Sequence, residues 1–340
     1  MTEIFTYIIL VLAINFLLKK INFLPNYIGQ AHQLFTSQKN IPLSGGIFVL
    51  LIIIFIFQDN KTFLLISLSI FLIGIASDKN YVVSPKIRMI LQILVVFILV
   101  YNLDLTVTST RVDLFNRLLE NSFIGFLFIS FCILVLINGS NFIDGLNGLL
   151  IGYFMIVVFV IYNLGLLNQM GLDENSLRFL FISFGFILVL NYFSFFYLGD
   201  SGSYLLGIIL SFILINIYNL NEYIISPYFI ILLLWYPCFE NLFSILRKNK
   251  KNFSPIYPDN KHLHQLIFFY LKQKIKFNTK YLNPFSSILI NLYNFIILYI
   301  GSLKANHTNY QILLLFLCIS TYILLYLFLN KKMKLIFNKK

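Results

Sequence analysis

Residues 138–148 read NGSNFIDGLNG, and the rest of the chain is organised around this polar stretch. Mostly apolar residues (123–137) precede it, and a second apolar run starts at Leu149. Unpartnered polar groups at membrane depth cost on the order of several kcal/mol each. Asn, Ser and Asp side chains between two such runs are therefore expected to have polar partners or a function. Two interpretations are open: a polar turn capped by Asn and Gly, or the floor of a polar pocket around Asp144.

The composition places the chain in a membrane. Of its 340 residues, 59% are hydrophobic and only 11% are charged, whereas roughly 25% of the residues in a soluble domain are charged. Cys132, Cys238 and Cys318 lie within apolar runs, which indicates small buried side chains rather than disulfides or a metal site. We therefore expect one all-α integral membrane domain over residues 1–340.

Eleven apolar segments come close to the length of a transmembrane helix, although several must borrow flanking residues to cross a bilayer. We expect a polytopic helical bundle of about 10–11 spans. The approximate cores of these segments are 4–18, 45–57, 63–76, 89–103, 123–137, 149–167, 177–193, 204–218, 227–246, 284–300 and 311–329.

Basic residues are distributed unequally between the two sets of loops. The loops after odd-numbered spans, with the C-terminal tail, hold 20 of the 25 Lys and Arg residues, and the alternate loops hold five. By the positive-inside rule, the N-terminus lies outside and the odd-numbered loops lie in the cytoplasm. The net charge of +12 is then a topology signal and a contact for anionic lipids, not a mark of nucleic-acid binding.

Three aspartates fall on the cytoplasmic side, each in a polar or Gly-rich stretch beside a span: Asp78, Asp144 and Asp200. Carboxylate oxygens are hard ligands that suit Mg²⁺ or Mn²⁺ rather than zinc. Gly-rich turns at helix N-termini offer backbone N–H groups to anions. The combination predicts a catalytic site for a diphosphate substrate, such as a nucleotide, at the cytoplasmic face. The simpler alternative is that Asp78 and Asp200 are helix caps.

The stretch 77–92 (SDKNYVVSPKIRMILQ) predicts the start of a helix. Pro85 suits the first turn of that helix, with Ser84 as its N-cap. Arg88 and Gln92 then lie four residues apart on one helix face.

Other polar positions are weaker signals. Tyr197, beside the glycines of YLGDSGSYLLG (197–207), suits stacking on a base. His262 and His264 alternate as in an extended segment, and such a pair is weak evidence for a metal site. Glu240 falls within an apolar span, where a charge is functional by default, and the alternative is a pair with a basic residue inside the bundle.

The stretches NGSNFIDGLNG, FFYLGDSGSYLLG and PDNKHLHQL occur in this order, within a region that runs from about His32 to Gln265. They resemble the motifs of the polyprenyl-phosphate N-acetylhexosamine-1-phosphate transferase family, of the glycosyltransferase family 4 type, which includes the undecaprenyl-phosphate N-acetylglucosaminyl 1-phosphate transferases. The resemblance implies that the protein couples a UDP-activated amino sugar to a polyprenyl phosphate, releases UMP and uses Mg²⁺, or Mn²⁺ in its place. It also implies a multi-pass protein of the bacterial inner (plasma) membrane that initiates synthesis of cell-surface polysaccharide, O-antigen lipopolysaccharide or cell-wall glycan.

The resemblance also implies roles for individual residues. The catalytic residues are Asp78, Asp144 and Asp200. The metal ligands are Asp200 and Asn141. The substrate-binding residues are Arg88, Asn138, Asn141, Asn147, Tyr197, Lys261, His262 and His264. The partners are a UDP-sugar, a polyprenyl phosphate and the membrane, without nucleic acid, and a homodimer is compatible with the sequence.

The chain departs from the family pattern at Ser77, Asn147 and Gln265, where the family has Asp, Asp and His. Ser77 argues against a mechanism in which the first Asp of the pair is a general base. A phosphate monoester has a second pKa near 6, so the lipid phosphate is mostly deprotonated without a base. The departures therefore indicate a variant subgroup.

Two other functions stay open. A transporter or lipid flippase would show inverted repeats and polar residues near span centres, whereas these polar stretches gather at one predicted face. A catalytically silent binding homologue is the second alternative, because Ser77 and Asn147 replace acidic positions.

Overall fold

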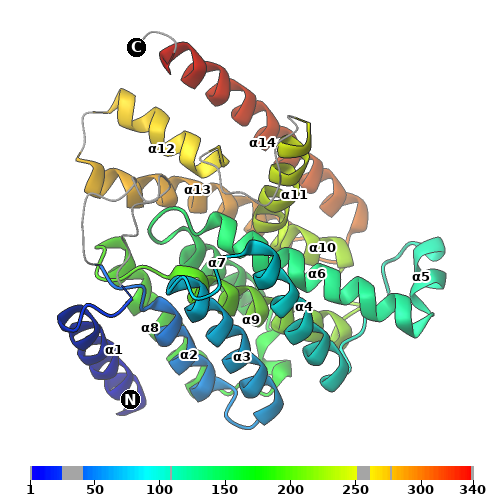
Figure 1. Ribbon diagram of the computed structural model, residues 1–340. Helices are drawn as coiled ribbons and strands as arrows, with labels where there is room; N and C mark the ends of the chain where they lie inside the picture. The colour runs from blue at the N-terminus through cyan, green and yellow to red at the C-terminus, as the bar shows by residue number, and fades with distance from the viewer. Residues whose placement is uncertain (1, 25–40, 108, 251–260, 276–277, 338–340) are drawn as a thin grey trace.

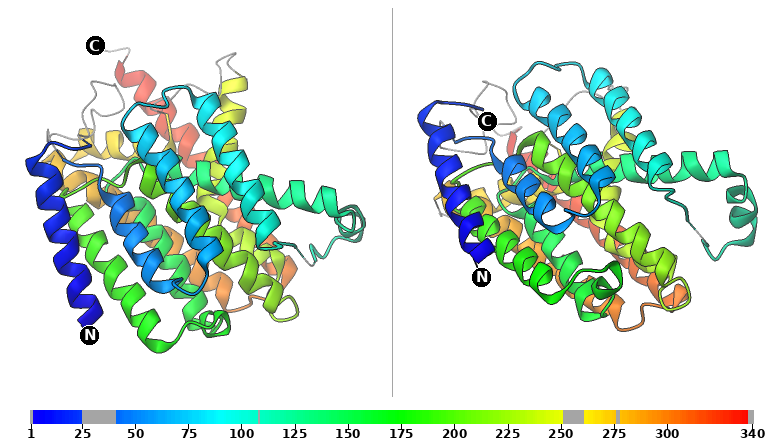
Figure 2. Two further views of the ribbon diagram at one scale, coloured as in Figure 1. Left: turned by 60° about the horizontal axis from the view of Figure 1, so that its bottom comes forward. Right: turned by 90° about the horizontal axis from the view of Figure 1, so that it is seen from below.

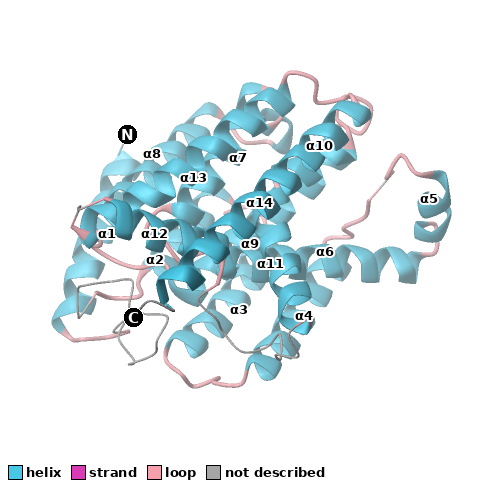
Figure 3. Cartoon of the chain, turned by 90° about the horizontal axis from the view of Figure 1, so that it is seen from above, coloured by secondary structure: helices cyan, strands magenta, loops and turns pink. Residues whose placement is uncertain are grey.

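The computed structural model describes residues 2–24, 41–107, 109–250, 261–275 and 278–337, and α-helices dominate these ranges (Figures 1 and 3). The helices are α1 (Thr2–Lys20), α2 (Gly45–Ile56), α3 (Lys61–Asp78), α4 (Pro85–Asn102), α5 (Asp113–Leu119), α6 (Ser122–Ile143), α7 (Leu149–Asn163), a 3-10 turn (Leu167–Met170), α8 (Glu174–Tyr192), α9 (Gly199–Leu220), α10 (Pro227–Leu233), α11 (Trp235–Asn249), α12 (Leu263–Lys274), α13 (Thr279–Ser302) and α14 (Thr308–Phe337).

Helix α9 is the centre of the bundle. Of its most apolar stretch, 78% is buried, against 17% for α1 and 28% for α14. Helices α2, α3 and α6 make their most extensive packing contacts with α9, and the other spans surround this group (Figures 1 and 2). The remaining helices therefore present their apolar faces outward, toward lipid, while α9 contacts protein along most of its length.

Gly74 allows α3 to approach α9 closely. A methyl group built on Gly74 would lie 2.2 Å from the Cα atom of Ser201 and 2.6 Å from its backbone nitrogen. Small residues at helix interfaces in membranes bring backbones within van der Waals contact, which is the main attraction available where both helix and lipid are apolar. This contact places the end of α3 against the first turn of α9.

The expected polytopic helical bundle is confirmed, with fewer full-length spans than the 10–11 expected. In the described residues, eight helices are long and apolar enough to cross a membrane, or nine if the bent pair α10 and α11 is one span, whereas the expected segments at α2 and α7 form shorter apolar helices. The segment expected at 227–246 is broken rather than continuous, because α10 and α11 meet at 74°. Pro237 explains the break, since its ring would clash with the carbonyl of Leu233 in a continuous helix and α10 ends at that residue.

Helix α5 and the first part of α6 project from the body of the bundle (Figures 1 and 2). Arg111 connects the segment before α5 to the body, because its guanidinium group donates hydrogen bonds to the backbone oxygens of Asn306, Glu222 and Ile225. The predicted site residues lie away from this projection, at one end of the bundle. Five helix ends meet there: the end of α3, the start of α4, the end of α6, and the starts of α9 and α12.

Candidate active site

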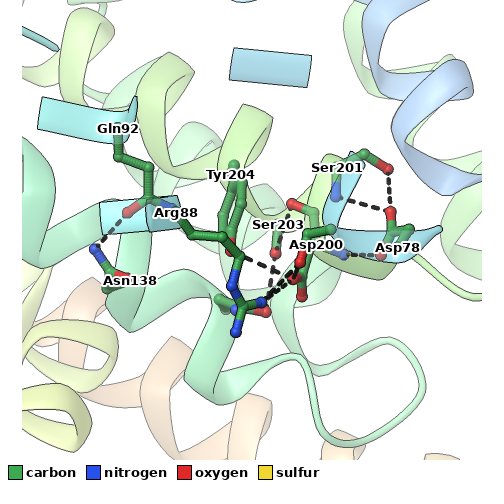
Figure 4. Close-up of polar contacts among 10 residues, drawn as sticks. Asp78, Arg88, Gln92, Asn138, Asp200, Ser201, Ser203 and Tyr204 are labelled. Atoms are coloured by element: carbon green, nitrogen blue, oxygen red, sulfur yellow. Dashed lines mark hydrogen bonds and ion pairs between the residues drawn. The ribbon is translucent and has the colours of Figure 1, made fainter. Parts of the chain in front are cut away.

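Asp78 caps the N-terminus of α9 from the end of α3 (Figure 4). Its Oδ1 accepts a hydrogen bond from the backbone N–H of Asp200 at 2.8 Å. Its Oδ2 accepts from the N–H of Ser201 at 3.1 Å and from the Ser201 hydroxyl at 2.8 Å. The carboxylate thus satisfies the orphan N–H groups of the helix and complements the positive end of its dipole. Asp78 is therefore a helix cap, but for a helix more than a hundred residues away in sequence.

Asp200 lies in the first turn of α9 and does not cap this helix, because Asp78 satisfies the first-turn N–H groups. Its Oδ2 accepts hydrogen bonds from Ser77 Oγ at 2.5 Å, Arg88 Nη1 at 2.7 Å and Tyr204 OH at 3.3 Å. Among the residues that the structure describes, no donor is bonded to Oδ1. One oxygen of Asp200 is thus held in place, and the other is available to a ligand.

Ser77 connects Arg88 to Asp200. Its hydroxyl accepts a hydrogen bond from Arg88 Nη1 at 2.7 Å while it donates to the Asp200 carboxylate. An Asp at this position would place a second carboxylate beside that of Asp200, and like charges at such a distance repel. The departure at Ser77 therefore allows the Arg88–Asp200 ion pair to form without a competing anion.

The α6 asparagines face α4 and α9. Asn138 donates to the Oε1 atom of Gln92 at 3.1 Å, as Figure 4 shows. Asn141 accepts a hydrogen bond from Ser203 Oγ at 3.2 Å, and the same hydroxyl lies 3.1 Å from the backbone oxygen of Asp200. These contacts bring both asparagines to the aspartate cluster, and their substrate and metal roles stay predictions.

Asp144 follows the last residue of α6 and lies near the other two aspartates. Burial, then the charges of Asp200 and Asp78, raise the pKa of the Asp144 carboxyl well above its usual range. Three carboxyl groups that are distant in sequence therefore interact at one end of the bundle. This juxtaposition is the one expected for the three predicted catalytic residues.

Asp144→Asn is expected to raise the melting temperature and to abolish activity. The folded-state pKa of this carboxyl is raised above its unfolded value, so the ionised form destabilises the fold increasingly as the pH rises from the unfolded to the folded pKa. Asn carries no such penalty. Thermal unfolding in detergent at mildly acidic and mildly alkaline pH measures the difference, which should be larger at alkaline pH. An equal increase in melting temperature at both pH values would contradict this prediction.

Asn147 is buried and engaged in packing the polar loop. Its backbone N–H donates to Asn283 Oδ1 at 2.7 Å, and its backbone oxygen accepts from Ser287 Oγ at 2.6 Å. Its side-chain nitrogen donates to Ser194 Oγ at 2.8 Å. The structure thus gives Asn147 a role in anchoring the loop to α13, and its contact with substrate stays a prediction.

Tyr197 and Lys261 border the site. Tyr197 is half-buried, and its backbone pairs with residues 42–46 (PLSGG), since its N–H donates to the backbone oxygen of Pro42 and its backbone oxygen accepts from the N–H of Gly45. Lys261 is exposed just before α12. Their contacts with substrate stay predictions, and His32 and residues 251–260 lie outside the described residues.

His262 and His264 are not in an extended segment. His262 precedes the first residue of α12 and His264 lies in its first turn, with the two rings nearly parallel at 14° and 5.7 Å apart. Burial lowers the pKa of His264 to about 3, so its ring is neutral, and within the described ranges neither of its nitrogens has a hydrogen-bond partner. Helix capping by His262 explains the difference from the expected alternation, because α12 starts one residue later.

The two histidines belong to the same site as the polar loop of residues 138–148. The ring of Phe142 lies 5.3 Å from that of His262. A methyl group on Gly145 would lie 2.3 Å from His264 Nε2, so only glycine permits this approach. Helix α12 is therefore seated against the segment that carries Asp144.

Three residues near the histidines were not among the predicted site residues: Phe142, Lys248 and Glu240. Lys248 is 5% exposed, and its Nζ lies 5.9 Å from the centre of the Phe142 ring. In the sequence it is one of several neighbouring basic residues, and nothing there distinguishes the buried one. Glu240 does carry a signal, because it is an acid within an apolar span, and its pairing with a basic residue is confirmed.

The donor set fits a magnesium ion that relies on its substrate for ligands. In the described part of the chain, no three His, Cys, Asp or Glu side chains converge on a metal position. Mg²⁺ normally binds through one or two carboxylates together with substrate phosphates and water. Asp200, through its Oδ1, and Asp144 meet that requirement, whereas the hydrogen bonds to both oxygens of Asp78 make it a support for Asp200.

The structure thus has an all-helical bundle with an acidic and basic cluster at one end. A family model described as glycosyl transferase family 4 matches residues 61–218. This segment of the chain is similar to that family. The matched region contains Asp78, Arg88, Asp144 and Asp200, so the similarity covers the segment that carries the site.

Curated relatives agree with the family. The chain is 28% identical over 226 residues to an undecaprenyl-phosphate alpha-N-acetylglucosaminyl 1-phosphate transferase of Thermotoga maritima. The aligned region covers 66% of this chain and 67% of the relative. It is 28% identical over 233 residues to a probable undecaprenyl-phosphate N-acetylglucosaminyl 1-phosphate transferase of Bacillus subtilis, 64% of this chain and 60% of the relative. A decaprenyl-phosphate N-acetylglucosaminephosphotransferase of Mycolicibacterium smegmatis is 30% identical over 149 residues, 38% of this chain and 37% of the relative.

Proposed function

We propose that this protein transfers a sugar 1-phosphate, with an N-acetylated amino sugar, from a UDP-sugar to a polyprenyl phosphate and releases UMP. The observation that carries the proposal is the cluster at the start of α9, where Asp200 is paired with Arg88, capped by Asp78 and close to Asp144. The names of the relatives supply the acceptor class, undecaprenyl or decaprenyl phosphate, and the N-acetylglucosamine group.

The reaction requires one bond to form and one to break. An oxygen of the lipid phosphate attacks the β-phosphorus of the UDP-sugar, and the bond from that phosphorus to the oxygen bridging to the α-phosphorus breaks, which releases UMP. The attacking oxygen is mostly deprotonated at neutral pH, so Ser77 does not have to act as a base. Positioning and charge neutralisation then account for most of the rate acceleration, as in other phosphoryl transfers.

Each residue of the cluster has a defined part in this proposal. Asp200 and Asp144 would hold Mg²⁺, which would supply charge neutralisation at the phosphates. Arg88 shares its charge between Asp200 and the incoming diphosphate. Asp78 holds the backbone of Asp200 in place in the first turn of α9. Tyr197, Asn138 and Asn147 hold the nucleotide, and Lys261 and the two histidines hold its phosphates.

The transporter alternative is less well supported. Polar residues do occur inside α13, but Asn291 donates to the backbone oxygens of Gly148 and Leu149, so it supports the polar loop. We place the cluster on the cytoplasmic face, with the N-terminus outside, because 20 of 25 basic residues fall in the loops on that side. A bacterial plasma membrane supplies both UDP-sugars and polyprenyl phosphate there, for the first step of a surface or cell-wall glycan.

The test is a transfer assay with membranes that contain the protein. A panel of UDP-sugars is supplied with polyprenyl phosphate and Mg²⁺, and both UMP and the lipid-linked sugar diphosphate are measured. UMP release with at least one sugar, dependent on lipid and metal, is expected. UMP release without lipid, or nucleotide binding without turnover for every sugar, would refute the transferase and favour a silent homologue.

A further inference from the structure

The last quarter of the chain carries positive charge without any negative charge. Residues 260–340 include eleven lysines and neither Asp nor Glu, and Asp259 is the last acidic residue. The positive-inside rule accounts for an excess of Lys and Arg on one side of the membrane, but Asp and Glu contribute little to it. It therefore does not explain the absence of acids here. The charges of these lysines are balanced only by groups outside this part of the chain.

The fold brings two pairs of these lysines together at the C-terminal ends of α12 and α14, which pack against each other (Figure 1). The Tyr270 ring of α12 lies 6.2 Å from the Phe328 ring of α14. Lys274 follows Tyr270 by four residues and therefore shares its helix face. Lys331 and Lys332 share the face of Phe328 in the same way, and the Nζ atom of Lys332 lies 5.8 Å from the centre of that ring. We call four exposed residues the lysine cluster: Lys272, Lys274, Lys331 and Lys332.

The lysine cluster has no counter-charge of its own. Within the ranges that the structure describes, none of its four members forms an ion pair with Asp or Glu. Like charges that are close together repel, so an external anion that binds among them removes an unfavourable interaction. The ammonium group of lysine is a compact point charge that binds phosphate well. The cluster therefore favours a ligand that presents several phosphate groups.

The apolar surface beside the cluster indicates that this ligand is a lipid. Leu324, Leu327 and Phe328 of α14 are 67%, 57% and 48% exposed, and the lysines of α14 follow within one helical turn. Exposed apolar side chains on a membrane helix contact lipid tails, and aromatic and basic residues mark the level of the headgroups. At that depth the available anions are the phosphates of acidic phospholipids. A soluble acidic protein would match the charges but not the adjoining apolar face.

Helix α12 connects the lysine cluster to the candidate active site. Its first turn lies at the site, since a methyl group on Gly145 would lie 2.3 Å from Nε2 of His264. All buried side chains of α12 belong to residues 263–268, and residues 269–274 have none. Anions bound at the cluster therefore hold the less buried end of a helix whose other end contacts the polar loop of residues 138–148.

We propose that the lysine cluster binds the headgroups of anionic phospholipids and that this binding, by holding α12 against the polar loop, increases the nucleotide affinity of the transferase site. The regulatory part of this inference rests on the proposed function, whereas the lipid site does not. The lipid then acts as an activator that is distinct from the polyprenyl phosphate acceptor, because it binds at the opposite end of α12 from the histidines.

Amide hydrogen exchange of the full-length protein in nanodiscs tests the lipid site without reference to activity. Phosphatidylglycerol added to phosphatidylcholine should slow exchange in α12 by about tenfold, as expected when a ligand is present at roughly ten times its dissociation constant. Lys272→Gln/Lys274→Gln and Lys331→Gln/Lys332→Gln should each lose most of this effect. These side chains are exposed, so the variants should keep the wild-type melting temperature in phosphatidylcholine.

The matched control is Lys19→Gln/Lys20→Gln. It removes two neighbouring exposed lysines from the end of α1, on the same predicted face, and should retain the full response to phosphatidylglycerol. Soluble glycerol phosphate, added to phosphatidylcholine nanodiscs, distinguishes a free phosphate from a lipid headgroup and should not slow exchange in α12.

The regulatory part is tested by the dissociation constant of UDP in the same nanodiscs. Phosphatidylglycerol should tighten UDP binding by about fivefold or more, the lower end of the usual coupling between two sites. Both lysine-cluster variants should bind UDP as the wild type does in phosphatidylcholine, whichever lipid is present. An unchanged wild-type dissociation constant would overturn the regulation.

The lipid site is overturned if phosphatidylglycerol leaves exchange in α12 unchanged, if the Lys19 and Lys20 control loses the response as well, or if glycerol phosphate reproduces it. The first outcome would leave an acidic protein as the occupant, the second a general effect of surface charge. A protein whose α12 responds to phosphatidylglycerol but that releases no UMP with any UDP-sugar would keep the lipid site and refute the proposed transferase function.

Discussion

Asp200→Asn is expected to reduce metal-dependent transfer by at least about a hundredfold while the protein still folds and inserts. Asn has the shape of Asp, but it carries no charge to balance Arg88 at 2.7 Å. To keep the hydrogen bonds from Ser77 and Arg88, the amide must direct its oxygen toward them. Its NH₂ group then takes the place of Oδ1, where a metal ion needs a lone pair. The side chain is 22% exposed, so the substitution leaves the buried packing of α9 intact.

The measurement is UMP release as a function of Mg²⁺ concentration, together with the elution profile of the detergent-solubilised protein. Asp59→Asn is the matched control, since this exposed acid lies between α2 and α3. It should leave both properties unchanged. Activity of Asp200→Asn within tenfold of wild type would show that Asp200 is not a metal ligand.

Gly74→Ala is expected to prevent correct folding of the bundle. The added methyl group would lie 2.2 Å from Ser201 Cα and 2.6 Å from its nitrogen, and both atoms belong to the backbone of the central helix. A side chain could rotate away, but here α3 must move as a whole. That shift would break the three hydrogen bonds that Asp78 accepts from Asp200 and Ser201. We expect a destabilisation of about 3 kcal/mol or more, in spite of the higher helix propensity of Ala.

The yield of monodisperse protein and its melting temperature in detergent measure this effect. Gly185→Ala on α8 is the control, because the nearest atom to its added methyl would be Met155 Cε at 3.9 Å, an ordinary contact. The control should be neutral or slightly stabilising. Equal melting temperatures for the two variants would mean that α3 and α9 are not held together at Gly74.

Much of the architecture was predictable because it follows from local chemistry. Apolar segments of span length locate the helices whatever their neighbours are, and Pro85 and Ser84 mark the start of α4 as expected, although the Ser84 side chain makes no capping hydrogen bond. The gathering of Asp78, Asp144 and Asp200 was predictable because each lies in a polar stretch at the same predicted face, and a magnesium site for a diphosphate needs carboxylates.

Other features depend on contacts between distant segments, which no local pattern encodes. From the sequence, Asp78 is expected to cap a helix close to it in the chain. In the structure it caps α9, which begins at Gly199. Pro237 indicates a helix break near Leu234, but the apolar run on both sides of it led to the prediction of one continuous span. The alternation of His262 and His264 suggested extended backbone, whereas a helix start gives the same spacing.

Helix α9 is at once the most enclosed element of the protein and the carrier of Asp200. Its first turn is tied to α3 through Asp78 and to α4 through Arg88, and its length is enclosed by α2, α3 and α6. A nucleotide that binds to this turn should therefore stabilise the entire bundle against unfolding, and not only a surface loop. Its binding should slow amide hydrogen exchange deep within the membrane, far from any atom that the ligand touches.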